Sequence, residues 1–137
     1  MGILDGTVMV VSGIGPGLGR SIALQAARAG ADVVLAARTA ARIEEVAGEV
    51  TALGRRALAV PADITDQDSA AGVMEAALAE FGRVDTLVNN AFAIPPLTSL
   101  AEADLDAIRQ AFDTNVVGTL RMTRLFAKGS PPAAARS

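Results

Sequence analysis

Short apolar runs rich in β-branched and small residues occur four times in the first ninety positions of the chain. Each run is closed by glycine or polar residues, a pattern typical of strands that are buried on both faces of a sheet. We therefore expect a sheet of at least four strands. The predicted strands are residues 7–12, 32–37, 56–60 and 86–89.

Helical periodicity occupies the three intervals between these runs. In the first interval Leu18, Ile22 and Ala26 recur at the spacing of one helix face. Glycine follows each periodic stretch, as is common just past the end of a helix. Thr65 and Asp68 have the spacing of a capping box, which predicts the start of the third helix. The predicted helices are residues 17–29, 40–53 and 65–81.

Strict alternation of strands and helices with short connections predicts an α/β fold, a Rossmann-type doubly wound parallel sheet. After a Pro-Pro loop, residues 100–127 predict one long helix or two consecutive helices, and no fifth strand follows. Residues 128–137 are small, polar or proline-rich, which predicts a disordered tail. The expected organisation is one incomplete domain over residues 1–127, truncated after the fourth strand and the helix that follows it.

Composition narrows the possible chemistry. The chain is 51% apolar and 3% aromatic, so we expect a core of Ala, Val, Leu and Ile. It contains no Cys and no His, which excludes disulfides, thiol and imidazole catalysis and the usual zinc sites, and no metal is expected. A net charge of -3 without a basic cluster argues against nucleic acid or an anionic membrane as partner. No apolar run could span a membrane and no secretory signal is recognisable, so the expected location is the cytoplasm.

Residues 12–19 (SGIGPGLG) connect the first predicted strand to the first predicted helix. In such a connection a pyrophosphate meets exposed amides and the positive end of the helix. Gly13, Gly17 and Gly19 would then provide a tight turn, a close approach to phosphate and close helix packing. Tight turns need glycine without any ligand as well. The position of this loop in a strand-helix-strand unit is what favours dinucleotide binding.

The glycine spacing in this loop, together with an Asn-Asn-Ala segment, resembles the short-chain dehydrogenase/reductase family. The loop has the spacing G-x-x-x-G-x-G, and Ser12 stands where the family usually has threonine. Asn89, Asn90 and Ala91 end the fourth predicted strand, as in the family's Asn-Asn-Ala-Gly segment, and Phe92 replaces the glycine.

Two further segments extend the resemblance over residues 4–127. Asp63 lies in the sequence PADITD at the position where the family's carboxylate hydrogen-bonds the adenine amino group. Asn115, in TNVVG, matches the family's active-site asparagine, which implies a remnant of a water-linked proton relay. A purely structural role stays open for both residues: Asp63 could begin a turn, and Asn115 could be an ordinary polar residue within a helix. The expected cofactor-binding residues are Ser12, Gly13, Gly15, Gly17, Leu18, Gly19, Arg38, Asp63, Ile64, Asn90 and Ala91.

The end of the second predicted strand bears on the choice between the two nicotinamide dinucleotides. A carboxylate there would bind the ribose 2'-hydroxyl of NAD and repel the 2'-phosphate of NADP. This chain has Ala37 at that position and Arg38 next to it. Because a guanidinium pairs well with phosphate, NADP(H) is favoured over NAD(H). The other interpretation is that Arg38 is simply solvated.

The resemblance also implies what catalysis would need: a tyrosine, a lysine four residues later, and a serine that positions the carbonyl. The chain has no Tyr, and its one lysine is Lys128. We therefore expect an oxidoreductase-family chain that binds NAD(P)(H) but is inactive alone. In the family, hydride passes between the nicotinamide and a carbonyl or alcohol substrate, and the substrate here is not assigned.

Two other interpretations stay open at this point. A non-catalytic dinucleotide-binding or interaction module would pair with another subunit, or form a homo-oligomer, through the exposed edge of the fourth strand. A Rossmann-type site for S-adenosylmethionine would usually need an acidic residue after the second strand. Ala37 and the Asn-Asn-Ala segment count against that ligand.

Overall fold

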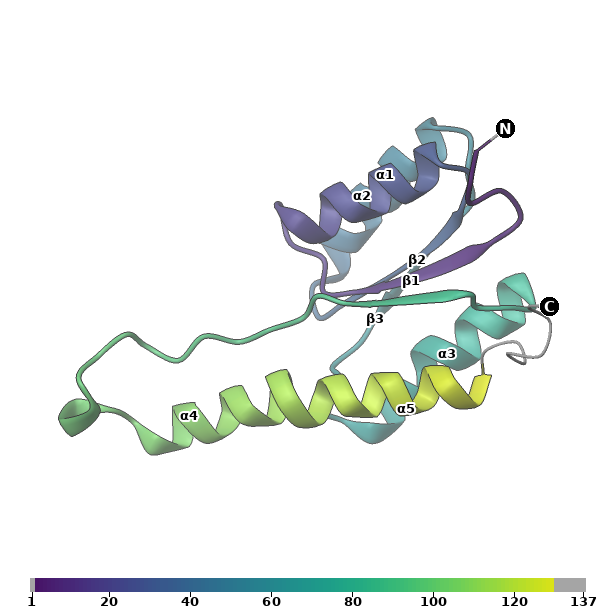
Figure 1. Cartoon of the computed structure of the whole chain (residues 1–137). Coiled ribbons are helices and arrows are strands. Elements are labelled where there is room, and N and C mark those ends of the chain that lie inside the picture. Colours follow the sequence, from purple (N-terminus) through teal and green to yellow (C-terminus); the bar gives the residue numbers. More distant parts are fainter. Residues whose placement is uncertain (1, 130–137) are drawn as a thin grey trace.

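Four parallel strands form one sheet in the order β3-β2-β1-β4 (Figure 1). The structure is a computed structural model and describes residues 2–129. Ser12 is paired with Ala36 on one side and with Asn89 on the other, so the carboxyl ends of the strands are aligned at one edge. This arrangement confirms the predicted α/β, Rossmann-type sheet. The strands are β1 (Val8–Ser12), β2 (Asp32–Ala37), β3 (Ala57–Pro61) and β4 (Thr86–Asn89).

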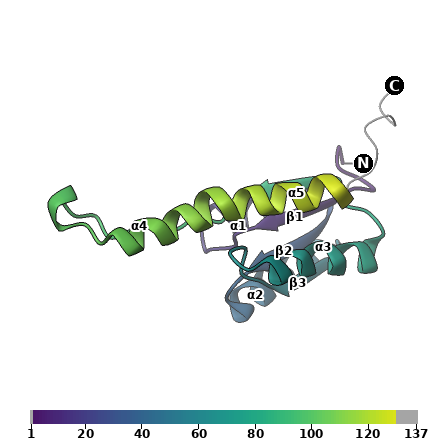
Figure 2. The same ribbon diagram turned by 90° about the horizontal axis from the view of Figure 1, so that it is seen from below.

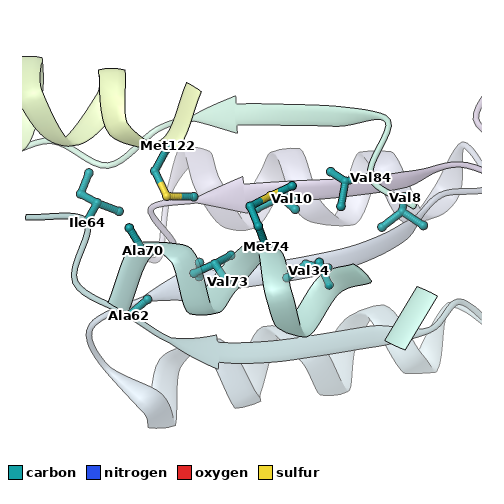
Figure 3. Packing of buried hydrophobic residues seen from close by; sticks show 12 residues of the cluster. Val8, Val10, Val34, Ala62, Ile64, Ala70, Val73, Met74, Val84 and Met122 are labelled. Carbon is teal, nitrogen blue, oxygen red and sulfur yellow. The ribbon is translucent and has the colours of Figure 1, made fainter. Parts of the chain in front are cut away.

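Helices cover both faces of the sheet, α1 and α2 on one face and α3 and α5 on the other (Figure 1). Successive residues of the central strands point to opposite faces and so divide between two apolar layers. Val10 and Val34 pack towards α3, as Figure 3 shows, whereas Val11 and Val33 pack towards α1 and α2. The bounds are α1 (Leu18–Arg28), α2 (Ala40–Ala52), α3 (Gln67–Phe81) and α5 (Thr119–Gly129).

The start of α3 differs from the sequence-based expectation. Asp66 is the residue that caps this helix, and its carboxylate accepts a hydrogen bond from the Ser69 amide at 2.8 Å. The predicted capping box of Thr65 and Asp68 is therefore wrong. Thr65 instead donates its hydroxyl to Asp63 at 2.7 Å, which removes it from the helix. Thr65 and Asp66 both carry a side-chain oxygen that could cap the helix, and sequence spacing alone does not show which of the two does so.

The first turn of α1 also corrects the sequence-based picture. Leu18, placed on the apolar face by its spacing, is 66% exposed. This turn packs against the glycine loop through Gly19, which is buried, and Leu18 is left facing outwards. The apolar face of α1 towards the sheet is instead built from Ala23, Leu24, Ala26 and Ala27.

A long helical rod follows β4, as predicted, but it begins at Leu105 rather than at Leu100, where the chain forms only a 3-10 turn. The chain leaves β4 in an extended path, passes a 3-10 turn, η1 (Leu100–Glu102), and returns as α4 (Leu105–Phe112). A π-helical segment, η2 (Asp113–Gly118), joins α4 to α5 without a break (Figure 2). Figure 1 shows α4 and the extended chain before it projecting beyond the sheet. α5 runs through Gly129, two residues beyond the predicted end of the domain, and the rest of the predicted tail lies outside the described residues.

The rod leaves much of its apolar surface exposed. Leu105, Phe112, Val116 and Leu120 are all exposed, whereas Ala111, Gly118 and Met122 are buried. β4, at the end of the sheet, is only half-buried. Within residues 2–129, no helix is long and apolar enough to cross a membrane.

A buried carboxylate ties the amino ends of β2 and β3 together, at the edge of the sheet opposite to the glycine loop. Asp32 is 6% exposed and accepts hydrogen bonds from the Arg55 side chain and from the Arg56 amide, each at 3.0 Å. Burial acts to raise the pKa of Asp32, but the hydrogen bonds and charges of the two arginines outweigh it and hold that pKa below its ordinary value. The ionised form is therefore the one that stabilises the fold.

Replacement of Asp32 by asparagine is expected to lower the free energy of unfolding at pH 7 by about 1–3 kcal/mol, because hydrogen bonds to a charged group are lost. Since the folded pKa is depressed, this stabilisation is present above pH about 4 and disappears as the pH falls through the lower folded value. Urea unfolding of both proteins at neutral and acidic pH measures the difference. A gap between the two proteins that stays constant down to the lowest pH would contradict this account.

Candidate functional site

The residues predicted to bind a cofactor gather where the four strands end. Gly13 follows β1, Arg38 follows β2, Asp63 comes two residues after β3, and Asn90 follows β4. The carboxyl ends of neighbouring parallel strands meet at one edge, so these side chains share one side of the molecule. Ligands of open α/β sheets bind at this kind of edge. The four loops that leave the strands there therefore form the candidate site.

Gly13 and Gly19 are required by the packing of the protein itself. Gly13 has φ +102, and a Cβ there would lie 2.5 Å from Ala91 Cα and 2.6 Å from the Asn90 carbonyl carbon. A Cβ on Gly19 would collide with the Gly13 carbonyl oxygen and lie 3.0 Å from Asn90 Nδ2. These two glycines let the loop, the first turn of α1 and the chain after β4 come into direct contact.

Asn90 joins the glycine loop to the end of β4. Its amide donates to the Ser12 carbonyl and its side-chain Nδ2 donates to the Gly13 carbonyl, both at 2.8 Å. Ser12 itself is buried at the last position of β1. The observed role of Asn90 is thus to shape the loop, and a direct contact with a cofactor stays a prediction.

Gly15 and Gly17 differ from the other two glycines because no neighbouring atom would collide with a side chain at either position. A Cβ at either position would meet no atom within 4 Å. Gly17 is the N-cap residue of α1, where no side chain caps the helix and no acidic residue lies in the first turn. Amides at such a helix start attract anions. Open space over an uncapped helix start fits a phosphate group.

Asp63 sits in a turn that orients its carboxylate. Oδ1 accepts from the Thr65 amide at 2.9 Å and from the Thr65 hydroxyl at 2.7 Å. These hydrogen bonds, and more weakly the charges of Arg38 and Arg121, hold the pKa of Asp63 below its ordinary value against the opposing effect of burial. The group is therefore ionised at neutral pH and acts as an acceptor.

Two groups in this turn have no hydrogen-bond partner within the described part of the chain. They are Asp63 Oδ2 and the Ile64 amide, an acceptor and a donor on adjacent residues. The Ile64 side chain is buried in the core, so only its main chain is available to a ligand. An adjacent acceptor and donor match the amino group and N1 of adenine.

Arg38 is exposed immediately after β2, and its charge acts on Asp63 across the edge of the sheet. Nearby, α2 begins after Thr39, which forms no side-chain cap, and the first turn of α2 has no acidic residue. The region around Arg38 is thus positively polarised and suits an additional anionic group.

Asn115 lies in the π-helical segment and pairs with the chain that follows β4. Its Oδ1 accepts from the Ala93 amide at 2.7 Å, and its Nδ2 donates to the Ala93 carbonyl at 2.8 Å. The side-chain amide thereby copies the pairing of a neighbouring strand. This geometry corresponds to the structural role that the sequence left open, and a part in a proton relay stays a prediction.

Arg121 contacts the turn that carries Asp63, and it was not identified from the sequence. Its Nη1 donates to the Ile64 carbonyl at 2.6 Å and its Nε to Gln67 Oε1 at 3.1 Å. The two segments lie more than fifty residues apart, and no local motif marks an arginine that binds a distant carbonyl. The role of Arg121 can be recognised only when it is known that α5 packs beside the turn after β3.

Two hollows of the surface lie away from this edge. One of about 330 Å³ lies beside α1 and is lined by Met9 and Ile22 among others. The second, of about 280 Å³, is lined by residues from Pro95 to Ile108 at the projecting end. Neither hollow includes a residue of the strand-end site. A ligand at the glycine loop would lie along an open edge of this chain.

Comparison with known proteins identifies the family. The sequence profile described as short chain dehydrogenase matches residues 7–130. An uncharacterized oxidoreductase of Methylorubrum extorquens is 39% identical over 129 residues, which is 93% of this chain and 52% of that protein. The chain spans about a third to a half of the length of the curated relatives it matches.

Solved structures give the same result. A short-chain type dehydrogenase/reductase from Mycobacterium marinum superposes with a TM-score of 0.87 at 31% identity, covering 92% of this chain and 51% of that one. A 3-ketoacyl-(acyl-carrier-protein) reductase from Brucella melitensis, complexed with NADH, gives 0.85 at 36% identity, covering 92% and 50%. Proteins of this family bind NAD(P)(H) through a Rossmann-type fold. The chain therefore belongs to the short-chain dehydrogenase/reductase family of oxidoreductases.

Proposed function

We propose that this chain forms the dinucleotide-binding part of an oxidoreductase that transfers hydride between NAD(P)(H) and a carbonyl or alcohol substrate. The observation that carries the proposal is the open space at Gly15 and Gly17 above the uncapped start of α1. No contact within the protein explains these glycines, whereas a bound pyrophosphate would. The cofactor, when bound, supplies the hydride donor or acceptor.

The remaining contacts follow from the groups left free at the strand ends. The glycine loop would hold the pyrophosphate through its amides, with Gly13 and Gly19 shaping it. Asp63 Oδ2 and the Ile64 amide would hold the adenine. Ala91, beside the loop, would form part of the wall towards the nicotinamide.

A preference for NADP(H) over NAD(H) is part of the proposal. Ala37 offers no carboxylate for a ribose hydroxyl, and Arg38 is exposed beside the uncapped start of α2. A 2'-phosphate would gain charge-assisted hydrogen bonds there. The Brucella relative is complexed with NADH, so the family alone does not decide the preference.

Catalysis by these residues alone is not expected. The 137 residues contain no Tyr, His or Cys, and Lys128 is the one lysine. Asp63 is ionised at neutral pH and cannot serve as a general acid. We infer that these residues bind the dinucleotide and do not themselves supply the general acid for hydride transfer. A cytoplasmic location stays a prediction from the sequence.

A second candidate function would use β4, which lies at the end of the sheet and has no further partner strand among residues 2–129. A non-catalytic module could pair with another subunit, or with a second copy, through this edge, because unpaired strand edges bind further strands. Sedimentation separates the two proposals. A chain that is monomeric at all concentrations would exclude self-association through β4.

The test of the main proposal is thermal unfolding with saturating NADP+ or NAD+, compared with Arg38→Asp. A ligand that binds only the folded state must raise the midpoint. We expect NADP+ to raise it more than NAD+, and Arg38→Asp to weaken NADP+ binding about tenfold or more by losing a charge-assisted contact and adding repulsion. Calorimetry measures the two affinities.

Arg28→Asp is the matched control, since Arg28 is also exposed and is the last residue of α1, at the end of that helix away from the glycine loop. It changes the net charge equally and should retain most of the preference for NADP+. A midpoint that responds to neither dinucleotide in the unmodified chain would overturn the proposed function. An unchanged preference in Arg38→Asp would overturn only the assignment of the 2'-phosphate site.

A further inference from the structure

Arg121 connects the last helix to the turn that carries Asp63. It lies in the first turn of α5 and is half-buried. Arg20, Arg55, Arg56, Arg83 and Arg109 each form an ion pair with a carboxylate. Arg121 instead donates to a main-chain carbonyl, that of Ile64, 57 residues away in the sequence. A guanidinium bound to a neutral carbonyl fixes the position of the chain, and the charge of Arg121 also acts weakly on the nearby Asp63 carboxylate.

The same helix fixes the other end of Ile64. Its side chain is buried in the same apolar cluster as Ala70 and Met122, which lie beside it in Figure 3. A Cβ on Gly118 would lie 2.9 Å from the Ile64 side chain, so the π-helical segment is already in close contact with it. The carbonyl and the side chain of Ile64 are therefore both held by one continuous rod.

Asp63 and Thr65, on either side of Ile64, are tied together by their own hydrogen bonds. The Thr65 amide and hydroxyl both donate to Asp63 Oδ1, and the Asp66 amide donates to the Asp63 carbonyl at 3.1 Å. These bonds close the turn, and two more anchor it: the Asp63 amide donates to the Ser69 hydroxyl and the Ala62 amide donates to the Ala37 carbonyl, both at 2.9 Å. The contact from Arg121 adds a further anchor at the carbonyl of Ile64, the residue that directly follows Asp63.

We propose that Arg121 is a positioning residue for base recognition, holding the Ile64 carbonyl so that Asp63 Oδ2 and the Ile64 amide together face the edge of a 6-aminopurine. The inference rests on the proposed dinucleotide function. Adenine offers a donor at its amino group and an acceptor at N1, which complement these two groups. Hypoxanthine, with an oxo group and an N1–H, presents the opposite pattern. Arg121 thereby contributes to selectivity for adenine without touching the base.

The test compares the affinities of NADP+ and its deamino analogue, in which hypoxanthine replaces adenine, by calorimetry. The unmodified chain should prefer NADP+ by about tenfold or more, since a hydrogen bond to a charged group is lost with the analogue. Arg121→Met should reduce this ratio to within about threefold, and Arg121→Lys, which can still donate to the carbonyl, should restore part of it. Arg124→Met, an exposed arginine on the same helix, is the matched control and should keep the full ratio.

Amide hydrogen exchange in the ligand-free chain gives a second measurement. Thr65 and Asp66, whose amides both donate to Asp63, should exchange about tenfold faster in Arg121→Met, while the amides of β1 and those of Arg124→Met should be unchanged. Equal loss of affinity for both dinucleotides in Arg121→Met, or unchanged exchange at Thr65 and Asp66, would overturn the role of Arg121. Failure of the unmodified chain to bind either dinucleotide would instead overturn the proposed function and the base contact with it.

Discussion

Replacement of Gly17 by aspartate is expected to abolish dinucleotide binding while the chain stays folded. A side chain at Gly17 would collide with no neighbouring atom, because a Cβ there would meet nothing within 4 Å. The carboxylate would fill the space proposed for the pyrophosphate and would itself satisfy the positive start of α1. Repulsion between like charges about 4 Å apart near a surface amounts to about 4 kcal/mol. Calorimetry with NADP+ should therefore show at least about a hundredfold loss of affinity.

Gly72→Asp provides the control for this variant. Gly72 lies within α3 on the other face of the sheet, is also free of atoms within 4 Å of a Cβ, and takes the same change of charge. Its affinity for NADP+ should match that of the unmodified chain. If Gly17→Asp binds NADP+ as tightly as Gly72→Asp, the pyrophosphate does not lie over the start of α1.

Replacement of Gly13 by alanine is expected to have the largest effect on stability. The added Cβ would lie 2.6 Å from the Asn90 carbonyl carbon, and alanine would have to adopt φ +102. Backbone strain of this kind costs about 1–3 kcal/mol, and the displaced chain would also lose the hydrogen bond from Asn90 to the loop. Urea unfolding should show a loss of about 3–5 kcal/mol, or no cooperative transition.

Gly15→Ala is the control, because it tests whether any substitution in the glycine loop destabilises the fold or only a substitution at Gly13. Gly15 has no positive φ, and a Cβ there meets no atom within 4 Å. Its free energy of unfolding should stay within about 0.5 kcal/mol of the unmodified chain. Similar losses for Gly13→Ala and Gly15→Ala would contradict the contact between the loop and the chain after β4.

The strands and the first three helices could be predicted because their signals are local. The apolar runs of β1 and β2 and the glycine at each helix end depend on neighbouring residues alone, and Gly82 adopts the left-handed conformation (φ 77) expected just past α3. Features decided by distant parts of the chain were not accessible. Leu18 matches the helical period of α1, yet the packing of Gly19 on the loop turns it outwards.

In the candidate site, too, features marked by local motifs could be predicted, and features that depend on distant segments could not. The glycine loop and the Asn-Asn-Ala segment could be located from their motifs, but motifs do not distinguish a glycine needed by the protein, such as Gly13, from one left open, such as Gly17. The π-helical turn and the pairing of Asn115 with Ala93 arise from how the rod meets the chain after β4. Arg121 acts on a turn formed by another segment, so its role became visible only with the packing of α5.

The bridge between Asn90 and the glycine loop also bears on the order of folding. It joins residues 77 positions apart, whereas β1, β2 and β3 follow one another with only single helices between them. Contacts across long separations form late, because closing a long loop costs entropy before it gains contacts. A chain still emerging from the ribosome would hold three paired strands before β4 docks beside β1. Cofactor affinity would then arise only after β4 has docked, and a dinucleotide would stabilise the assembled sheet rather than guide its formation.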